Sequence, residues 1–86
     1  MNTLQIDKVT YGNKPHIQLT YISSIWKPEV HELLLPWVSY IERNENSVIC
    51  FVKDIKLAKK MVKYLQAYLD LLDDKFFIED RLGIYD

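Results

Sequence analysis

Two segments near the N-terminus have the composition and the polar–apolar alternation of β-strands. Leu4 to Tyr11 and His16 to Ile22 are rich in β-formers, and every other residue of the second segment is apolar. Between them, the Gly12-Asn13 pair tolerates the positive φ angles that a tight hairpin turn requires. The pattern therefore predicts an antiparallel β-hairpin.

The apolar residues of the first strand do not keep one phase. Leu4 and Ile6 alternate in one register, whereas Val9 and Tyr11 alternate in the other. An extra residue in one strand produces such a shift. We therefore expect a β-bulge near Asp7-Lys8.

The middle of the chain carries apolar residues at helical spacing. Lys27-Pro28-Glu29 is typical of a helix start, because proline suits the first helical position. Apolar residues then recur at helical intervals from Val30 to Ile41. Pro36 removes a backbone donor inside this run, so we expect a kink or two short helices. The polar segment 43–46 is predicted to end the element.

The next segment predicts a strand followed by a long helix. Ser47 to Lys53 is apolar on both alternating faces, which is typical of a central strand. Asp54 is a suitable N-cap, and Ile55 to about Asp74 contains neither glycine nor proline. Residues 76–78 are predicted to add an edge strand, and residues 81–86 to form a C-terminal tail whose order is left open.

Together these elements predict one small α+β domain spanning residues 1–86, with the order ββαβα and a last β-strand. The antiparallel hairpin and the central apolar strand are expected to be packed by a kinked first helix and a long second helix. The chain has 86 residues, of which 49% are hydrophobic and 27% charged, which fits a single folded domain with a small core.

The long helix has more apolar surface than a sheet alone would cover. Its apolar arc spans about 200°, whereas a helix on a sheet needs little more than about 100°. Leu57, Tyr64 and Leu71 are spaced by seven and flank this arc like a helix–helix seam. We favour packing of the first helix on this seam, and the alternative is self-association as a homodimer or a groove for a partner.

Charge is polarised along the second half of the chain. Residues 53–63 carry a net charge of +4 and residues 70–86 a net charge of −4. Both signs oppose the helix dipole, at a cost on the order of 0.3–1 kcal/mol for each misplaced charge at low salt. A role in recognition would explain why cations lie at the beginning of the helix and anions at its end. The alternative is that the lysines only form a solvated polar face. The candidate partner-binding lysines are Lys53, Lys56, Lys59, Lys60 and Lys63.

The sequence offers no catalytic or metal-binding constellation, so we expect no enzyme, cofactor or metal site. The lone Cys50 lies in an apolar segment, where burial would suppress its thiolate. His31-Glu32 resembles the start of a zinc-protease motif, but Leu35 stands where the second histidine would be. The acidic pairs 73–74 and 79–80 lack calcium-loop spacing.

Composition indicates the setting in which the protein acts. Lysine far outnumbers arginine, and residues with AT-rich codons are abundant, which suggests a phage, a mobile element or an AT-rich microbial host. Short chains from such sources are often inhibitors or adaptors. No apolar run is long enough to span a membrane, so we expect a cytoplasmic location without membrane association.

We therefore expect a small protein-interaction module that binds another protein with an acidic surface. Its charged faces would dock, and Trp26 in the connection before the first helix would serve as an aromatic anchor. The alternative is weak nucleic-acid binding through the lysine face, with Tyr11, Tyr21 or His16 as stacking surfaces. A pI of about 6.1 argues against the alternative.

Overall fold

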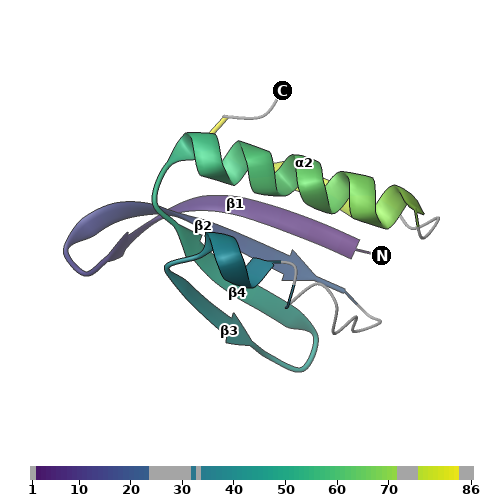
Figure 1. The fold of residues 1–86 in the computed structure, drawn as a ribbon, viewed down its shortest axis with the longest axis horizontal. Coiled ribbons are helices and arrows are strands. Elements are labelled where there is room, and N and C mark those ends of the chain that lie inside the picture. The colour runs from purple at the N-terminus through teal and green to yellow at the C-terminus, as the bar shows by residue number, and fades with distance from the viewer. Residues whose placement is uncertain (1, 24–31, 33, 72–75, 84–86) are drawn as a thin grey trace.

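Over the residues that the structure describes, the protein is an α+β domain in which helix α2 packs on a mixed sheet (Figure 1). The computed structural model describes residues 2–23, 32, 34–71 and 76–83. The elements are β1 (Asn2–Tyr11), β2 (Lys14–Ile22), the 3-10 turn η1 (Leu35–Trp37), β3 (Tyr40–Arg43), β4 (Ser47–Val52), α2 (Ile55–Leu71) and β5 (Phe76–Asp80).

The five strands lie in the order β3-β4-β2-β1-β5. The pairs β1–β2, β2–β4 and β3–β4 are antiparallel, whereas β1 and β5 are parallel. Because β4 and β5 both run in the direction of β1, α2 forms a crossover that passes β2 and β1. β4 is an interior strand, but β2 and not β4 occupies the centre of the sheet.

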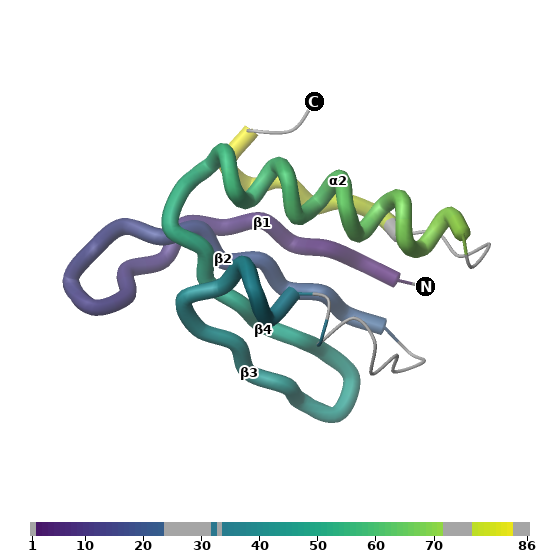
Figure 2. Tube along the Cα trace, in the orientation of Figure 1, coloured from purple at the N-terminus to yellow at the C-terminus, as the bar shows by residue number. Residues whose placement is uncertain are grey.

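The predicted hairpin is confirmed, and the predicted bulge is wrong. β1 and β2 pair without interruption from Thr3 with Ile22 to Tyr11 with Lys14. Gly12 and Asn13 form the turn with φ angles of 59° and 62°, in the conformation that their residue types favour. Figure 2 shows this hairpin extending past the beginning of α2.

The phase shift in β1 instead reflects the two faces of the sheet. Leu4 and Ile6 are fully buried on the face that α2 covers. Val9 and Tyr11 lie on the opposite face, where Tyr11 contacts aromatic rings of β2, β3 and β4. The strand thus buries one face along its first half and supplies apolar residues to the other face along its second half.

The core lies between the sheet and the inward face of α2. The helix buries every third or fourth residue against it, as its amphipathic pattern predicted. The buried helix residues are Ala58, Met61, Val62, Leu65 and Leu69. Opposite them the sheet buries Leu4, Ile6, Ile17, Leu19, Tyr21, Val48, Cys50 and Val52, with Leu34 alongside.

The predicted first helix differs most from the structure. Residues 24–31 and 33, which include its predicted start and Trp26, lie outside the described residues. Within the described part, Glu32 and Leu34 are helical and Pro36 lies in η1. Tyr40–Arg43, expected in part to be helical, instead form strand β3. Pro36 interrupts helical hydrogen bonding. The backbone then becomes extended and pairs with β4. The prediction of two packed helices is not confirmed.

The C-terminal predictions hold better. Asp54 caps α2, which is described as far as Leu71, and residues 72–75 lie outside the described part. The predicted edge strand at 76–78 is observed as β5, which continues to Asp80. Part of the predicted tail is folded, because Asp80 Oδ1 accepts hydrogen bonds from the N–H groups of Leu82 and Gly83. Residues 84–86 lie outside the described residues.

Candidate functional site

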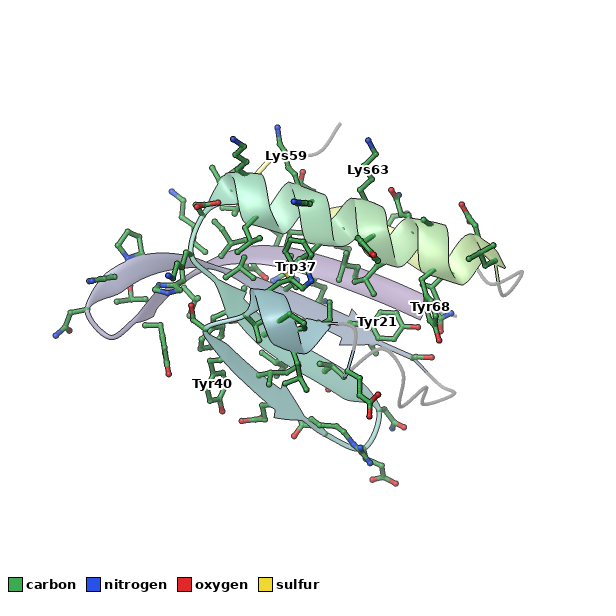
Figure 3. The ribbon with its side chains drawn as sticks, in the orientation of Figure 1. Tyr21, Trp37, Tyr40, Lys59, Lys63 and Tyr68 are labelled. Carbon is green, nitrogen blue, oxygen red and sulfur yellow. The ribbon has the colours of Figure 1, made fainter. Side chains whose placement is uncertain are left out.

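The five candidate lysines are all exposed, and four of them lie on α2. We call Lys53, Lys56, Lys59, Lys60 and Lys63 the lysine face. Figure 3 shows Lys59 and Lys63 pointing away from the sheet. None of the five forms an ion pair with a carboxylate in the described part of the chain. Their side chains are therefore exposed together, just before α2 and along it as far as its middle.

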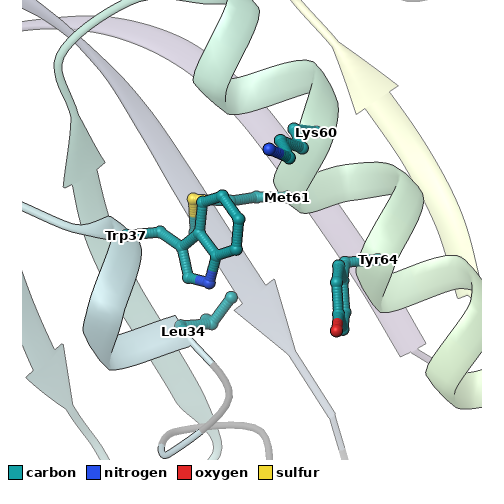
Figure 4. Close-up of a pocket in the computed structure, with 5 residues that line it drawn as sticks. All are labelled: Leu34, Trp37, Lys60, Met61 and Tyr64. Atoms are coloured by element: carbon teal, nitrogen blue, oxygen red, sulfur yellow. The ribbon is translucent and has the colours of Figure 1, made fainter.

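One member of the lysine face has a second contact. The Lys60 ammonium lies 4.8 Å from the centroid of the Trp37 ring, in cation–π geometry. Figure 4 shows Trp37 between η1 and α2, beside Leu34 and Met61. The cavity at this contact has a volume of only about 10 Å³, which is room for about one water molecule. The Trp37–Lys60 contact therefore packs η1 against α2 and leaves no space for a ligand.

The helix N-terminus is already occupied by a side chain. Asp54 Oδ1 accepts a hydrogen bond of 2.8 Å from the N–H of Leu57, as an N-cap residue does. An external anion at this end would meet the Asp54 carboxylate. Any anion bound near α2 must therefore be held by the lysine side chains and not by the first turn of the helix.

A basic cleft lies beside the beginning of α2. It has a volume of about 860 Å³ and is lined by the outer part of the hairpin, the end of β4 and the first helix residues. Its cations are Lys8, Lys53 and Lys56, with His16 at its wall. An adjoining hollow of about 580 Å³ shares His16 and Lys53 and adds Lys14 and Tyr11. The lysine face thus continues onto the hairpin.

Four rings from four strands gather on the sheet face that α2 does not cover. Tyr40 and Phe51 are stacked with their centroids 4.9 Å apart, and Tyr11 lies 5.4 Å from Phe51 and 5.7 Å from Tyr40. His16 meets Tyr11 edge to face at 5.5 Å. We call these residues the aromatic cluster. Figure 3 shows Tyr40 at β3, the edge strand farthest from α2.

Glu42 changes the acidity of Tyr40 in the aromatic cluster. The Tyr40 hydroxyl donates a hydrogen bond of 2.8 Å to Glu42 Oε1. This bond raises the pKa of Tyr40 above its ordinary value, and desolvation and the Glu42 charge act in the same direction. Tyr40 is therefore held as a neutral hydrogen-bond donor.

Of the residues expected to stack on bases, two belong to this cluster and one does not. Tyr11 is 38% exposed at the edge of the cluster, and His16 packs beside it. Tyr21 is 1% exposed in the core and is no surface for stacking. Tyr40 and Phe51 were not among the predicted site residues, because Tyr40 was expected to lie in the first helix and Phe51 to be covered in a central strand. Recognising Tyr40–Arg43 as a strand would have placed both side chains on one face.

The three residues of the predicted helix seam separate in the structure. Leu57 is half-buried and packs against the core. Tyr64 is 54% exposed, and its ring centroid lies 6.2 Å from that of Trp37. Leu71 is 85% exposed. The seam is thus covered at its first position and in contact with Trp37 at its second, while Leu71 projects into solvent.

Cys50 is buried in the core of this fold. It is 1% exposed in β4, and burial raises the pKa of its thiol to about 12, outweighing a hydrogen bond to the Leu19 backbone. The thiolate is therefore suppressed at neutral pH. Among the residues that the structure describes, no three histidine, cysteine, aspartate or glutamate side chains gather closely enough to hold a metal ion.

Comparisons with known protein families, with curated proteins and with solved structures found no match to this chain. Over the described ranges, no helix combines the length and the apolar character needed to cross a membrane. The candidate functional features of the molecule are therefore the lysine face, the basic cleft and the aromatic cluster.

Proposed function

We propose that this protein is a cytoplasmic interaction module, an inhibitor or adaptor that binds an acidic surface of another protein through its lysine face. The observation that carries the proposal is the presentation of five exposed ammonium groups together, without an ion pair to any described carboxylate. Lysines at the beginning of a helix oppose its dipole, so folding stability alone does not account for them.

The arrangement of these lysines suits a protein surface better than a small anion. They extend over the outward side of α2 and into the basic cleft beside the hairpin. The Asp54 cap excludes an anion from the helix N-terminus itself. A broad acidic surface can meet such spread charges, which increase the rate of association and favour one orientation.

An aromatic anchor also lies near the charges. Trp26, which the sequence favoured for this role, lies outside the described residues. Tyr11 borders the hollow that Lys14 and Lys53 line, and it is 38% exposed. An aromatic ring beside a charged surface is typical of the residues that dominate binding energy in interfaces. We therefore include Tyr11 with Trp26 among the proposed anchors.

The proposal is tested by capture from cells that make the protein, after nuclease treatment of the lysate. The baits are the wild type, Lys56→Gln/Lys59→Gln, and the control Arg43→Gln/Arg81→Gln, which loses the same charge outside the lysine face and the basic cleft. We expect a protein that the wild type and the control retain, but that the lysine-face variant loses. Raising salt should release it, because exposed charges are screened.

The same proteins bound equally by all three baits would contradict the proposal. Circular dichroism establishes that each variant is folded. We expect Lys56→Gln/Lys59→Gln to unfold at the same or at a higher denaturant concentration than the wild type, because the replaced charges oppose the helix dipole. Lost binding would then not result from lost structure.

A second candidate function, binding of single-stranded nucleic acid, is supported by the aromatic cluster. Its rings lie on the open sheet face beside Lys14 and Lys53. Rings that accept bases beside cations that accept phosphates are typical of sequence-tolerant single-strand binding. The chain has a pI of about 6.1 and only two arginines, so we rank this function second.

This candidate is tested with fluorescent single-stranded and double-stranded oligonucleotides over a salt series. Binding should strengthen as salt falls, prefer the single strand, and weaken in Phe51→Ala more than in Ile49→Ala, a neighbour on the same sheet face. Absence of binding at the lowest salt would exclude it.

A further inference from the structure

The outward side of α2 carries a groove that the rest of the described chain leaves open. We call it the outer groove. It has a volume of about 330 Å³ and is lined by Lys60, Lys63, Tyr64, Ala67, Tyr68 and Leu71. Leu71 is 85% exposed and Tyr64 54% exposed, so large apolar side chains face solvent here. Burying them would be favourable, at about 25 cal/mol for each Å² of apolar surface.

The residues around the outer groove are placed symmetrically about Ala67. Along the helix, Lys63 lies four residues before Ala67 and Asp70 three residues after it. Tyr64 lies three residues before Ala67 and Leu71 four residues after it. At roughly 100° per residue, the charged pair lies about 40–60° to one side of Ala67 and the apolar pair about 40–60° to the other side.

We propose that a second copy of this chain docks on the outer groove, with the two α2 helices antiparallel and the two-fold axis beside Ala67. A two-fold axis across an antiparallel helix pair keeps each flank facing its own equivalent and reverses the order along the helix. Lys63 then faces Asp70 of the second copy, and Tyr64 faces Leu71 of the second copy. Symmetry makes each contact twice.

The small residue lies where the helices must approach most closely. Packed helices have their axes about 8–10 Å apart, and the lower end of this range requires small side chains at the crossing. Ala67 is exposed and is one of only two alanines in the chain. Tyr64 and Leu71 stand on either side of it along the helix and would interdigitate with their equivalents.

Charge order singles out a second copy as the occupant. Lys63 precedes and Asp70 follows the centre of the groove, and neither forms an ion pair with the rest of the described chain. The placement is unfavourable for the dipole of an isolated helix, but it is complementary to itself when the helix is reversed. A partner of uniform charge would match one of these residues and repel the other.

The dimer covers Lys60 and Lys63 of the lysine face and leaves its other three lysines exposed for docking. Lys53, Lys56 and Lys59 lie toward the beginning of α2, outside the outer groove, and would face solvent at both ends of the helix pair. The inference therefore does not depend on the proposed function, and either proposal can fail without the other.

Analytical ultracentrifugation at low salt tests the dimer, with protein at up to about 1 mM. The wild type should approach twice the chain mass of 10.3 kDa as concentration rises. Lys63→Glu and Asp70→Lys should each weaken self-association at least about tenfold, because each turns two attractions into repulsions. An equimolar mixture of the two variants should form a heterodimer, since their charges are complementary again.

The control is Lys59→Glu, which makes the same charge change outside the outer groove and should dimerise like the wild type. Leu71→Ser should weaken the dimer without changing the circular dichroism spectrum, because Leu71 is exposed in the single chain. A wild type that stays at the single-chain mass over the whole concentration range overturns the proposal. So does dimerisation of Lys63→Glu and Asp70→Lys at wild-type strength.

Discussion

At the scale of single residues, the surroundings of Cys50 and Asp54 decide what each does. Cys50 acts as a small hydrophobic core residue, because α2 and the sheet exclude water from it. Asp54 is the only carboxylate within the lysine-rich segment 53–63, and its position makes it a helix cap instead of a salt-bridge partner. Cys50 is therefore protonated at neutral pH, and Asp54 ends the helix by accepting a backbone hydrogen bond.

The raised pKa of Cys50 predicts a loss of stability in alkaline solution. The folded thiol has a pKa of about 12 against an ordinary value of 9.0, so the unfolded chain releases this proton first as pH rises. The Cys50 contribution to the free energy of unfolding is constant below pH 8. It then falls by up to about 1.4 kcal/mol per pH unit between the two pKa values.

Urea unfolding at several pH values from 8 to 11 measures this slope. In Cys50→Ala the contribution is absent, so the free energy of unfolding should start lower, because of the cavity, and fall less steeply with pH. Other groups titrate in both proteins and cancel in the comparison. Identical slopes for the two proteins would show that Cys50 does not have a raised pKa.

The cap at Asp54 predicts a defined cost for its removal. Asp54→Ala leaves the N–H of Leu57 without its 2.8 Å hydrogen bond. The free energy of unfolding should fall by about 0.5–2 kcal/mol in urea titrations. Asp54→Asn keeps a side-chain oxygen at the cap and should recover most of this loss. An Asp54→Ala variant as stable as the wild type would contradict the assigned role.

At the scale of elements, the two faces of α2 have different roles. Its inward face supplies five buried residues to the core, and its outward face carries the lysine face and the outer groove. The heptad spacing of Leu57, Tyr64 and Leu71 predicted one continuous seam. The seam is divided because Trp37 of η1 contacts Tyr64 and Lys60 near the middle of the helix, whereas Leu71 at its end is 85% exposed.

This division predicts opposite outcomes for two leucines of the same helix. Leu65 is 1% exposed, and Leu65→Ala should lower the free energy of unfolding by about 2–5 kcal/mol. Leu71 is 85% exposed, and Leu71→Ala should change it by no more than about 0.5 kcal/mol. The measurement is urea unfolding at low protein concentration, so that self-association does not contribute. A large loss in Leu71→Ala would show that Leu71 packs within the single chain.

At the scale of the whole molecule, β5 joins the end of the chain to its beginning. It pairs in parallel with β1, and the Arg81 N–H donates a hydrogen bond of 3.0 Å to the Ile6 carbonyl oxygen. Arg81 also lies 3.4 Å from Asp7 and 3.5 Å from Glu79. Ile78 and Leu82 pack against the core from this edge.

Removal of residues 72–86 is therefore expected to destabilise the entire sheet. β1 would become an edge strand with unpaired backbone groups, and the core would lose the cover of Ile78 and Leu82. Thermal melts followed by circular dichroism should show a midpoint lowered by roughly 4–8 °C for each kcal/mol lost. Arg81→Ala removes only exposed ion pairs and should cost no more than about 1 kcal/mol. A truncated chain that melts like the wild type would contradict the structural role of β5.

Local patterns were sufficient where a residue's own chemistry decides its conformation. The Gly12-Asn13 turn, the Asp54 cap, the amphipathic face of α2 and the burial of Cys50 follow from positive φ angles, hydrogen-bonding capacity and hydrophobic periodicity. The sequence by itself also determined the exposed lysine face, because the inward face of an amphipathic helix dictates which residues remain outside.

Only the tertiary structure decided how strands far apart in the chain combine. Tyr40–Arg43 lacks a strong strand signal of its own, and it is extended because pairing with β4 satisfies its backbone groups. That pairing creates the aromatic cluster, whose rings come from four strands. The phase of β1 was misread as a bulge for the same reason: which face of a strand is buried depends on what covers the sheet, and neighbouring residues do not encode it.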